Sequence, residues 1–242
     1  MDRHIVIAGQ GRAGSTLFYS MLRRTLDGFS MPGSETRAAS LINLSGNICT
    51  KRPFDIFEIP RILDLAEGRK RVDLIVTLRD PRDILVSRHS AVPDDYFYSA
   101  DNCYLIGPGQ APQRTAPGLI PVHDAIAKVA TSGLFPQGVF LLKYEDLVSD
   151  PERVQSHLTR DLGLSFTGSF RDFHKGEVPA ALAQALNGIR PVEAPAEPKW
   201  RKPEHLPRII DQFTRFPRLH QIMAALDYEQ DATWFDTLRA AA

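Results

Sequence analysis

Four short segments along the chain predict the strands of a buried sheet. They fall at about residues 3–9, 47–51, 72–78 and 138–143, and residues between them repeat apolar positions at helical spacing. The run 72–78 is almost continuously apolar and β-branched, which is typical of a strand covered on both faces. This alternation predicts three layers, α/β/α, around a central, mostly parallel sheet with right-handed crossovers. From about residue 150 onward the pattern is mostly helical.

The first predicted strand leads into a glycine-rich turn. Residues 5–16 are Ile-Val-Ile-Ala-Gly-Gln-Gly-Arg-Ala-Gly-Ser-Thr, and apolar residues at helical spacing follow. Backbone N–H groups at such a turn, together with the helix dipole, suit a phosphate or sulfate group. The ATP-binding pattern G-x-x-x-x-G-K-[ST] would place a lysine where Ser15 stands, and here the cation is Arg12. The alternative is a strand-turn-helix that binds nothing.

A second motif follows the strand at 72–78. Arg79 comes directly after it, then Asp80 suits a helix N-cap, Pro81 the first helical position and Asp83 the capping-box acid. We expect this helix to carry Ser87. The alternative for Arg79 is a surface ion pair with a neighbouring acid.

These segments resemble the sulfotransferases that use 3′-phosphoadenosine 5′-phosphosulfate (PAPS). G-x-x-[RK]-x-G-[ST]-[ST] at 9–16 is similar to their 5′-phosphosulfate loop, and Arg79 with Ser87 to their 3′-phosphate-binding element. Leu-Leu-Lys-Tyr-Glu-Asp-Leu at 141–147, before Asp-Pro-Glu, resembles a segment whose tyrosine holds the adenine side. Lys-Trp-Arg-Lys-Pro at 199–203 resembles a late segment that closes over the nucleotide. The resemblance runs from about residue 4 to about residue 226.

The resemblance implies a P-loop-like sulfotransferase architecture in a single domain over residues 1–242. It implies PAPS as donor and adenosine 3′,5′-bisphosphate as product, and we expect no metal. The donor-binding residues that it implies are Gly11, Arg12, Ala13, Gly14, Ser15, Thr16, Arg79, Ser87, Tyr144, Trp200, Arg201 and Lys202.

Arg12 and Lys51 are the candidate catalytic cations. Negative charge develops on the oxygen that bridges sulfur and phosphorus, and a fixed cation there lowers the barrier. Because arginine effectively never loses its proton, Arg12 would act by charge and hydrogen bonding alone. Lys51 keeps the lysine of the K-x-H segment found in hormone and phenol sulfotransferases, but Pro53 stands where their histidine would fall.

Glu35 is the candidate base. In glycan sulfotransferases a glutamate about two dozen residues after the loop cation takes this role, and Glu35 lies 23 residues after Arg12. Near the floor of a dry site its carboxylate would have a raised pKa and could accept a hydroxyl proton. The alternative is that Ser34 caps the next helix and Glu35 complements its dipole. Lys51, His89 and His123 remain open as other bases.

Residues 91–118 break every regular pattern with their prolines and glycines. The span exceeds the usual connection of about 4–6 residues, and its first half is crowded with Tyr96, Phe97, Tyr98 and Tyr104. Aromatic side chains at that density are costly to leave in water. We therefore expect a lid over the acceptor, with a contact in a homodimer as the alternative.

Composition excludes several function classes. The 29 basic residues balance 29 acidic ones, which favours neither nucleic acid nor an anionic membrane as the main partner. We expect no membrane span, because no apolar run approaches the necessary ~20 residues, and no signal peptide precedes the first strand. Cys49 and Cys103 show neither metal-ligand spacing nor a disulfide framework, which suits a reducing compartment, and we expect a cytoplasmic protein.

The sequence thus predicts a PAPS-dependent O-sulfotransferase that acts on a carbohydrate or another small hydroxylated acceptor. One alternative is a P-loop kinase or nucleotide hydrolase, which Ser15 and the presence of Arg79 in place of a metal-binding acid disfavour. Another is a catalytically inactive module that binds adenosine 3′,5′-bisphosphate and has no use for Glu35. The acceptor itself is not named by the sequence, since acceptor loops vary while the donor site stays recognisable.

Overall fold

The computed structural model describes residues 1–92, 95–106 and 109–240, which form two compact units. The first comprises Met1–Leu78 with Ile126–Ala194, and the second comprises Arg79–Ala125 with Pro195–Ala242. Each unit is therefore built from two separate stretches of sequence. The expectation of one domain over 1–242 stays a prediction beside this division.

A four-stranded parallel sheet forms the centre of the first unit. Its strands, in the spatial order β2-β1-β3-β6, are β1 (Asp2–Gly9), β2 (Ile48–Lys51), β3 (Lys70–Leu78) and β6 (Phe140–Lys143). All four predicted strands are confirmed. Ile7 pairs with Lys51 and Gly9 with Thr77, so the carboxyl ends of β1, β2 and β3 meet at one edge of the sheet.

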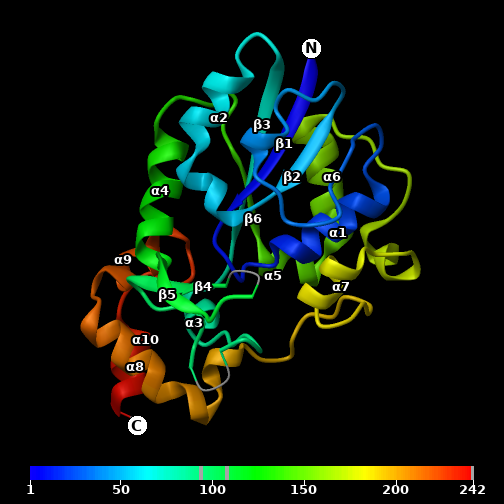
Figure 1. The fold of residues 1–242 in the computed structure, drawn as a ribbon. Helices are drawn as coiled ribbons and strands as arrows, with labels where there is room; N and C mark the ends of the chain where they lie inside the picture. The colour runs from blue at the N-terminus through cyan, green and yellow to red at the C-terminus, as the bar shows by residue number, and fades with distance from the viewer. Residues whose placement is uncertain (93–94, 107–108, 241–242) are drawn as a thin grey trace. The chain divides into compact units, whose positions relative to one another are not determined.

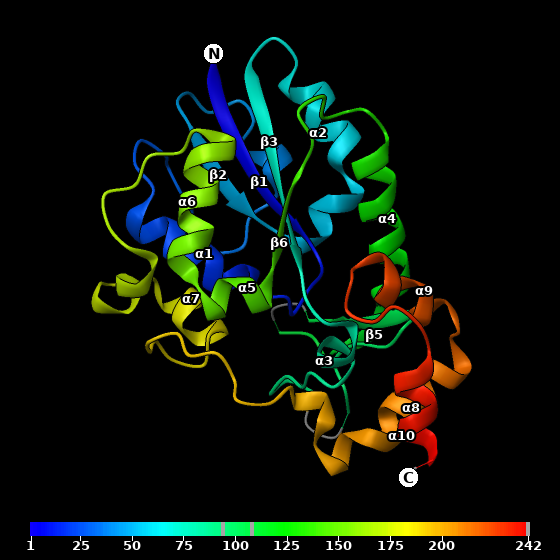
Figure 2. The same cartoon turned by 180° about the vertical axis from the view of Figure 1, so that it is seen from behind.

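Helices cover both faces of this sheet (Figures 1 and 2). Helices α1 (Ser15–Thr25) and α6 (Pro151–Leu162) lie on one face, and α2 (Ile59–Ala66) lies on the other with the part of α4 (Leu119–Thr131) that belongs to this unit. The main apolar cluster joins the sheet to the first face, and each buried side chain there stabilises the fold by about 1.5–3 kcal/mol. It includes Ile5, Ile7, Phe18, Met21, Leu22, Val154, Leu158, Phe170 and Phe173. The three predicted layers are confirmed.

Shorter elements complete the first unit. They are η1 (Ala38–Ser40), η2 (Pro53–Phe57), α5 (Tyr144–Ser149), η3 (Phe170–Lys175) and α7 (Ala180–Ala185). Helix α6 begins after Asp150, whose carboxylate accepts a hydrogen bond from the Arg153 N–H at 3.1 Å. It ends at Gly163, which adopts the left-handed conformation with φ 60°.

The helix predicted to follow Arg79 is shorter than expected. Asp80 caps α3 (Pro81–Leu85) by accepting from the Arg82 N–H at 2.9 Å, as predicted. The placement of Ser87 inside this helix is wrong, because α3 ends at Leu85. The Val86 N–H bonds to carbonyls of the last turn, and the Ser87 carbonyl accepts from the Phe97 N–H at 2.9 Å. The Ser87 N–H bonds to the Ile84 carbonyl in a tighter turn, so Ser87 lies beyond the last helical residue.

Residues 91–118 contain regular structure, which corrects the prediction of an irregular loop. Strands β4 (Asn102–Leu105) and β5 (Gln113–Pro117) form an antiparallel pair. The proline at the end of β5 and the glycine after it terminate the strand rather than prevent it. A Cβ on Gly118 would overlap the backbone of Asp101 and Asn102, so only glycine fits there. The prediction also involved Pro93, Gly107 and Pro108, which lie outside the described residues.

The second unit is otherwise helical, with η4 (Lys199–Arg201), η5 (Pro203–His205), α8 (Leu206–Arg215), α9 (Arg218–Ala225) and α10 (Thr233–Ala240). At its core the Arg82 guanidinium lies 4.2 Å from the Trp200 ring centroid and 4.7 Å from that of Trp234. After Lys143 the described chain forms helices but no further strand. Over its described length the chain has no helix that combines the length and apolarity needed to traverse a bilayer.

Candidate active site

The turn between β1 and α1 has the backbone of an anion-binding loop. Gly9 (φ 114°), Arg12 (φ 63°) and Gly14 (φ 76°) are all in the left-handed region, separated by residues that are not. Such alternation turns successive N–H groups toward a common concavity that suits anions. The arginine is the informative member, since a non-glycine residue in this conformation is strained and such strain is concentrated at functional sites.

The register of the sheet holds this loop in place. The Gln10 N–H donates to the Thr77 carbonyl at 3.0 Å, which extends the pairing of β1 with β3 by one residue. A Cβ on Gly9 would stand 2.8 Å from the Thr77 oxygen and 2.9 Å from a Val76 methyl carbon. The loop therefore leaves the sheet at a position that only glycine can occupy.

Tyr144 lies against the same loop. It is the first residue of α5, directly after β6, and a Cβ added to Gly14 would overlap its ring. The structure thus brings together two predicted donor-binding residues that lie far apart in the sequence.

Lys51 contacts two other predicted residues, Glu35 and Thr16, at the carboxyl edge of the sheet. Its Nζ donates to Glu35 Oε2 at 2.6 Å and to Thr16 Oγ1 at 3.3 Å, and its side chain is only 5% exposed. The Arg52 N–H donates to the Ile7 carbonyl, which fixes the end of β2 beside β1. A buried cation therefore stands next to the first turn of α1.

The surroundings of the Glu35 side chain differ from those that we predicted. Its side chain is 49% exposed, so the expected dry floor is wrong for this carboxylate. The alternative, in which Ser34 caps a helix and Glu35 complements its dipole, is wrong as well. No helix begins at Ser34, and the next helical turn starts at Ala38. Instead the Thr36 N–H donates to the Lys51 carbonyl at 3.3 Å, which ties this segment to β2. The position of Glu35 is set by its ion pair and not by burial.

In the second unit, Arg79 and Ser87 are both shielded from water. Arg79 is 9% exposed, and its Nη2 lies 2.8 Å from Asp83 Oδ2. An ion pair with a neighbouring acid is therefore present, but it is a buried one. The Ser87 hydroxyl is also buried, and among the described residues it has no hydrogen-bond partner. An orphaned buried hydroxyl costs free energy, so this one is suited to a ligand oxygen.

The late basic segment divides into a buried and an exposed part. Trp200 is 6% exposed, and its backbone N–H donates to Asp83 Oδ1 at 3.1 Å. Arg201 and Lys202 are exposed. Trp200 is thus packed into its own unit, which leaves the two cations beside it accessible to a ligand.

Comparisons with known proteins show which solved structures share the fold of this chain. No family model and no curated protein matches the chain. Several solved structures do. A sulfotransferase domain from the curacin biosynthetic pathway has a TM-score of 0.53 and 17% identity, over 83% of this chain and 90% of that one. Mouse sulfotransferase SULT7A1, complexed with PAP, has a TM-score of 0.60 and 13% identity, over 94% of this chain and 89% of that one. The chain has the sulfotransferase fold.

A third structure agrees with this assignment. The sulfotransferase domain from the Synechococcus PCC 7002 olefin synthase has a TM-score of 0.55 and 14% identity, over 84% of this chain and 88% of that one. At these identities the likeness concerns the fold alone, since one fold hosts many activities. The chemistry of the site has to be argued from its own residues.

The two histidines that were open as bases belong to the second unit of this sulfotransferase fold. The His89 Nδ1 accepts from the Ala91 N–H at 3.1 Å, and its ring lies 5.6 Å from that of Phe97. His123 is buried in α4, and burial lowers its pKa below the ordinary histidine value. His89 thus has partners within the second unit, while in the first unit Glu35 and Lys51 lie beside the loop.

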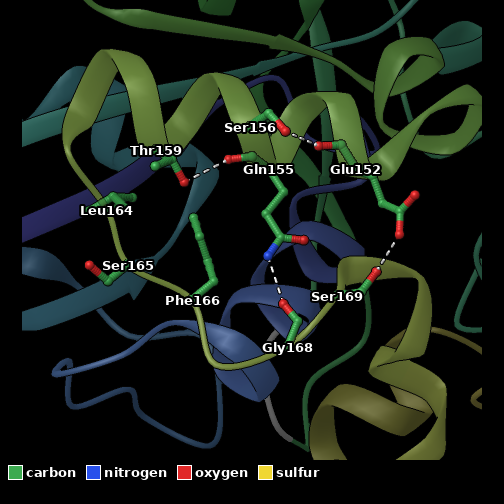
Figure 3. Close-up of a pocket in the computed structure, with 9 residues that line it drawn as sticks. All are labelled: Glu152, Gln155, Ser156, Thr159, Leu164, Ser165, Phe166, Gly168 and Ser169. Carbon is green, nitrogen blue, oxygen red and sulfur yellow. Dashed lines mark hydrogen bonds between the residues drawn. The ribbon is translucent and has the colours of Figure 1, made fainter.

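An open pocket of about 630 Å³ lies elsewhere in the sulfotransferase fold, between α6 and residues 164–169 (Figure 3). Gln155 Nε2 donates to the Gly168 carbonyl at 2.7 Å, and the Ser169 hydroxyl donates to the Glu152 carboxylate at 2.9 Å. None of its lining residues is a predicted site residue. Its polar groups bond to one another, so the pocket contributes nothing to the candidate site.

Sequence reasoning missed one residue with a central place in the second unit. Asp83 was predicted as a capping-box acid, but its two oxygens accept from Arg79 and Trp200. Sequence offered no signal for the second contact, because the partners are 117 residues apart. As for metals, the described residues contain no cluster of three histidine, cysteine or acidic side chains arranged to hold an ion.

Proposed function

We propose that this protein transfers a sulfuryl group from PAPS to a hydroxyl of a carbohydrate or another small hydroxylated acceptor. The observation that carries the proposal is the meeting of the left-handed loop, Thr16, Lys51 and Glu35 at the carboxyl edge of a sulfotransferase-fold sheet. Mouse SULT7A1, which is similar in fold, is complexed with PAP. We expect adenosine 3′,5′-bisphosphate to be the product released here.

The first unit would carry the reacting end of the donor. The N–H groups of Gly11–Thr16 would hold the 5′-phosphosulfate, and Tyr144 beside Gly14 would contact the adenine side. As the acceptor oxygen bonds to sulfur, the bond from sulfur to the bridging oxygen breaks. Arg12 and Lys51 would stabilise the charge that the leaving phosphate gains, and Glu35 would take the proton of the acceptor hydroxyl.

The second unit would read the 3′-phosphate. Arg79 supplies a guanidinium suited to bidentate phosphate contact, and the orphaned Ser87 hydroxyl supplies a donor that a phosphate oxygen would satisfy. Arg201 and Lys202 are exposed cations that would close over the nucleotide. Recognition of this phosphate separates the proposal from an ATP-using enzyme.

Thermal unfolding with different nucleotides tests the proposal. Adenosine 3′,5′-bisphosphate should raise the melting temperature far more than ADP or ATP, with or without magnesium, because only it carries the 3′-phosphate. Equal stabilisation by magnesium-ATP would favour the kinase or hydrolase alternative. Mass-spectrometric screening of hydroxylated metabolites with PAPS would identify the acceptor. Tight binding without turnover of any acceptor would favour the inactive module.

We also propose that the protein works in a reducing compartment such as the cytoplasm. Cys49 and Cys103 are both buried as free thiols. Burial raises the pKa of the Cys103 thiol to about 11, so little of it is the reactive thiolate at neutral pH. Both cysteines thus behave as small core residues.

A further inference from the structure

The carboxylate of Asp83 links two segments that the proposed function assigns to the donor. Oδ2 lies 2.8 Å from Arg79 Nη2, and Oδ1 accepts from the Trp200 backbone N–H at 3.1 Å. Asp83 is 6% exposed, so both interactions are shielded from water and from salt. One buried side chain therefore contacts both the 3′-phosphate element and the segment at 199–202.

The residue before it strengthens the same link. The Arg82 guanidinium lies 4.2 Å from the Trp200 ring centroid and is held by Asp80 at 2.8 Å and Glu229 at 2.6 Å. Consecutive side chains of α3 thus contact the ring and the backbone of Trp200. Movement of this helix would displace Arg79 and Trp200 together.

The ion pair also fixes the direction of the guanidinium. An arginine side chain has many rotamers, and contact with a carboxylate restricts them before a ligand arrives. A phosphate that meets a guanidinium already held in one plane loses less entropy on binding. Removal of the carboxylate would leave a buried cation without this charged partner.

We infer that Asp83 is a positioning residue for recognition of the 3′-phosphate. It orients Arg79 and joins the segment at 199–202 to it, so the preference for a 3′-phosphorylated nucleotide depends on a carboxylate that itself repels phosphate. The inference rests on the proposed function, because it takes Arg79 to be the ligand of that phosphate.

Asp83→Asn tests this with little change in shape. The asparagine oxygen can still accept from Trp200, while the charge that holds Arg79 is lost. Calorimetric affinities for adenosine 3′,5′-bisphosphate and for adenosine 5′-monophosphate should be compared, because the two differ only in the 3′-phosphate. We expect the preference for the bisphosphate to fall about tenfold or more, with the monophosphate affinity unchanged. Asp101→Asn, at an exposed acid of the same unit, is the control and should keep the preference.

A double-mutant cycle distinguishes orientation of Arg79 from a general loss of structure. In an Arg79→Ala background, Asp83→Asn should cause no further loss of preference. An unchanged preference in Asp83→Asn, or equal weakening of both nucleotides, would overturn the inference. If Asp83→Asn does not fold, Asp83→Ser also removes the charge, and an unchanged preference there has the same meaning. A wild-type protein without preference for the bisphosphate would instead refute the proposed function.

Discussion

At the scale of single residues, Lys51 gives the candidate site its electrostatic character. A lysine side chain at 5% exposure needs compensation, and Glu35 and Thr16 provide it. The pair is asymmetric, because Glu35 remains half-exposed. In the proposed mechanism the buried lysine would act beside the loop, and the more exposed carboxylate would meet the incoming hydroxyl.

Glu35→Gln tests the base. The amide keeps the shape and can still accept from Lys51, but it cannot take a proton. Turnover should fall about 10²- to 10⁴-fold while adenosine 3′,5′-bisphosphate binds normally, as measured by steady-state kinetics and calorimetry. Glu58→Gln, which removes a carboxylate paired with Arg52 in the same unit, is the matched control. Near-normal turnover in Glu35→Gln would leave Glu35 only as the partner of Lys51.

His4 should make stability depend on pH. Its ring is fully buried on β1, with Nε2 3.0 Å from the Thr50 hydroxyl, and burial, aided by the charge of Lys70, lowers its pKa from 6.5 to about 4. The unfolded chain therefore binds an extra proton between these values. Stability is fully present above about pH 6.5 and falls toward pH 4, by up to about 1.4 kcal/mol per pH unit from this residue.

Urea unfolding of the wild type and of His4→Gln between pH 7 and pH 5 measures this contribution. The difference between the two proteins should shrink as the pH falls, because only the wild type loses stability through His4. Parallel pH dependence in both proteins would show that His4 is not responsible.

At the scale of elements, the turn before α1 depends on Gly14. Gly14→Ala should weaken binding of adenosine 3′,5′-bisphosphate at least tenfold, because the new methyl group would overlap the Tyr144 ring and displace the loop. Gly28→Ala is a matched control. Gly28 has a similar φ, 73° against 76°, but no atom lies within 4 Å of the position its Cβ would take. Calorimetry should show normal nucleotide binding for Gly28→Ala; equal losses in both variants would assign the effect to backbone strain alone.

The hairpin β4–β5 offers a test of the predicted lid. Leu105 is 53% exposed and Ile106 37% exposed, next to the end of β4. If they cover the acceptor, Leu105→Ser with Ile106→Ser should raise the acceptor KM several-fold and leave nucleotide affinity intact. Leu134→Ser, at another exposed leucine, is the control. A change in molecular mass by light scattering, with an unchanged KM, would favour the dimer contact.

At the scale of the whole molecule, the proposed donor residues come from both units. Adenosine 3′,5′-bisphosphate should therefore slow amide hydrogen exchange at residues 9–16 of the first unit and at residues 79–87 of the second. Exchange followed by mass spectrometry measures the two segments in one experiment. Protection of only the first would contradict the assignment of Arg79 and Ser87.

The sequence by itself determined the elements whose signals are local. Strands β1, β3 and β6 were predictable because each contains a short apolar run, and the run in β3 is nearly continuous since both faces are covered. The starts of α3 and α6 were predictable because Asp80 and Asp150 bond to N–H groups two or three residues away. The loop at 9–16 was recognisable in part because Gly9 and Gly14 occupy backbone conformations that side chains disfavour.

The tertiary structure alone decided features that depend on contacts between distant residues. Beyond the end of α3 the Ser87 carbonyl pairs with the Phe97 N–H, and β4 forms because β5 pairs with it. The half-exposed ion pair of Glu35 with Lys51 and the bond from Trp200 to Asp83 also join residues that lie apart in the sequence. Local patterns specify backbone preference and burial, whereas the partner of a charged side chain is set by which segments the fold brings together.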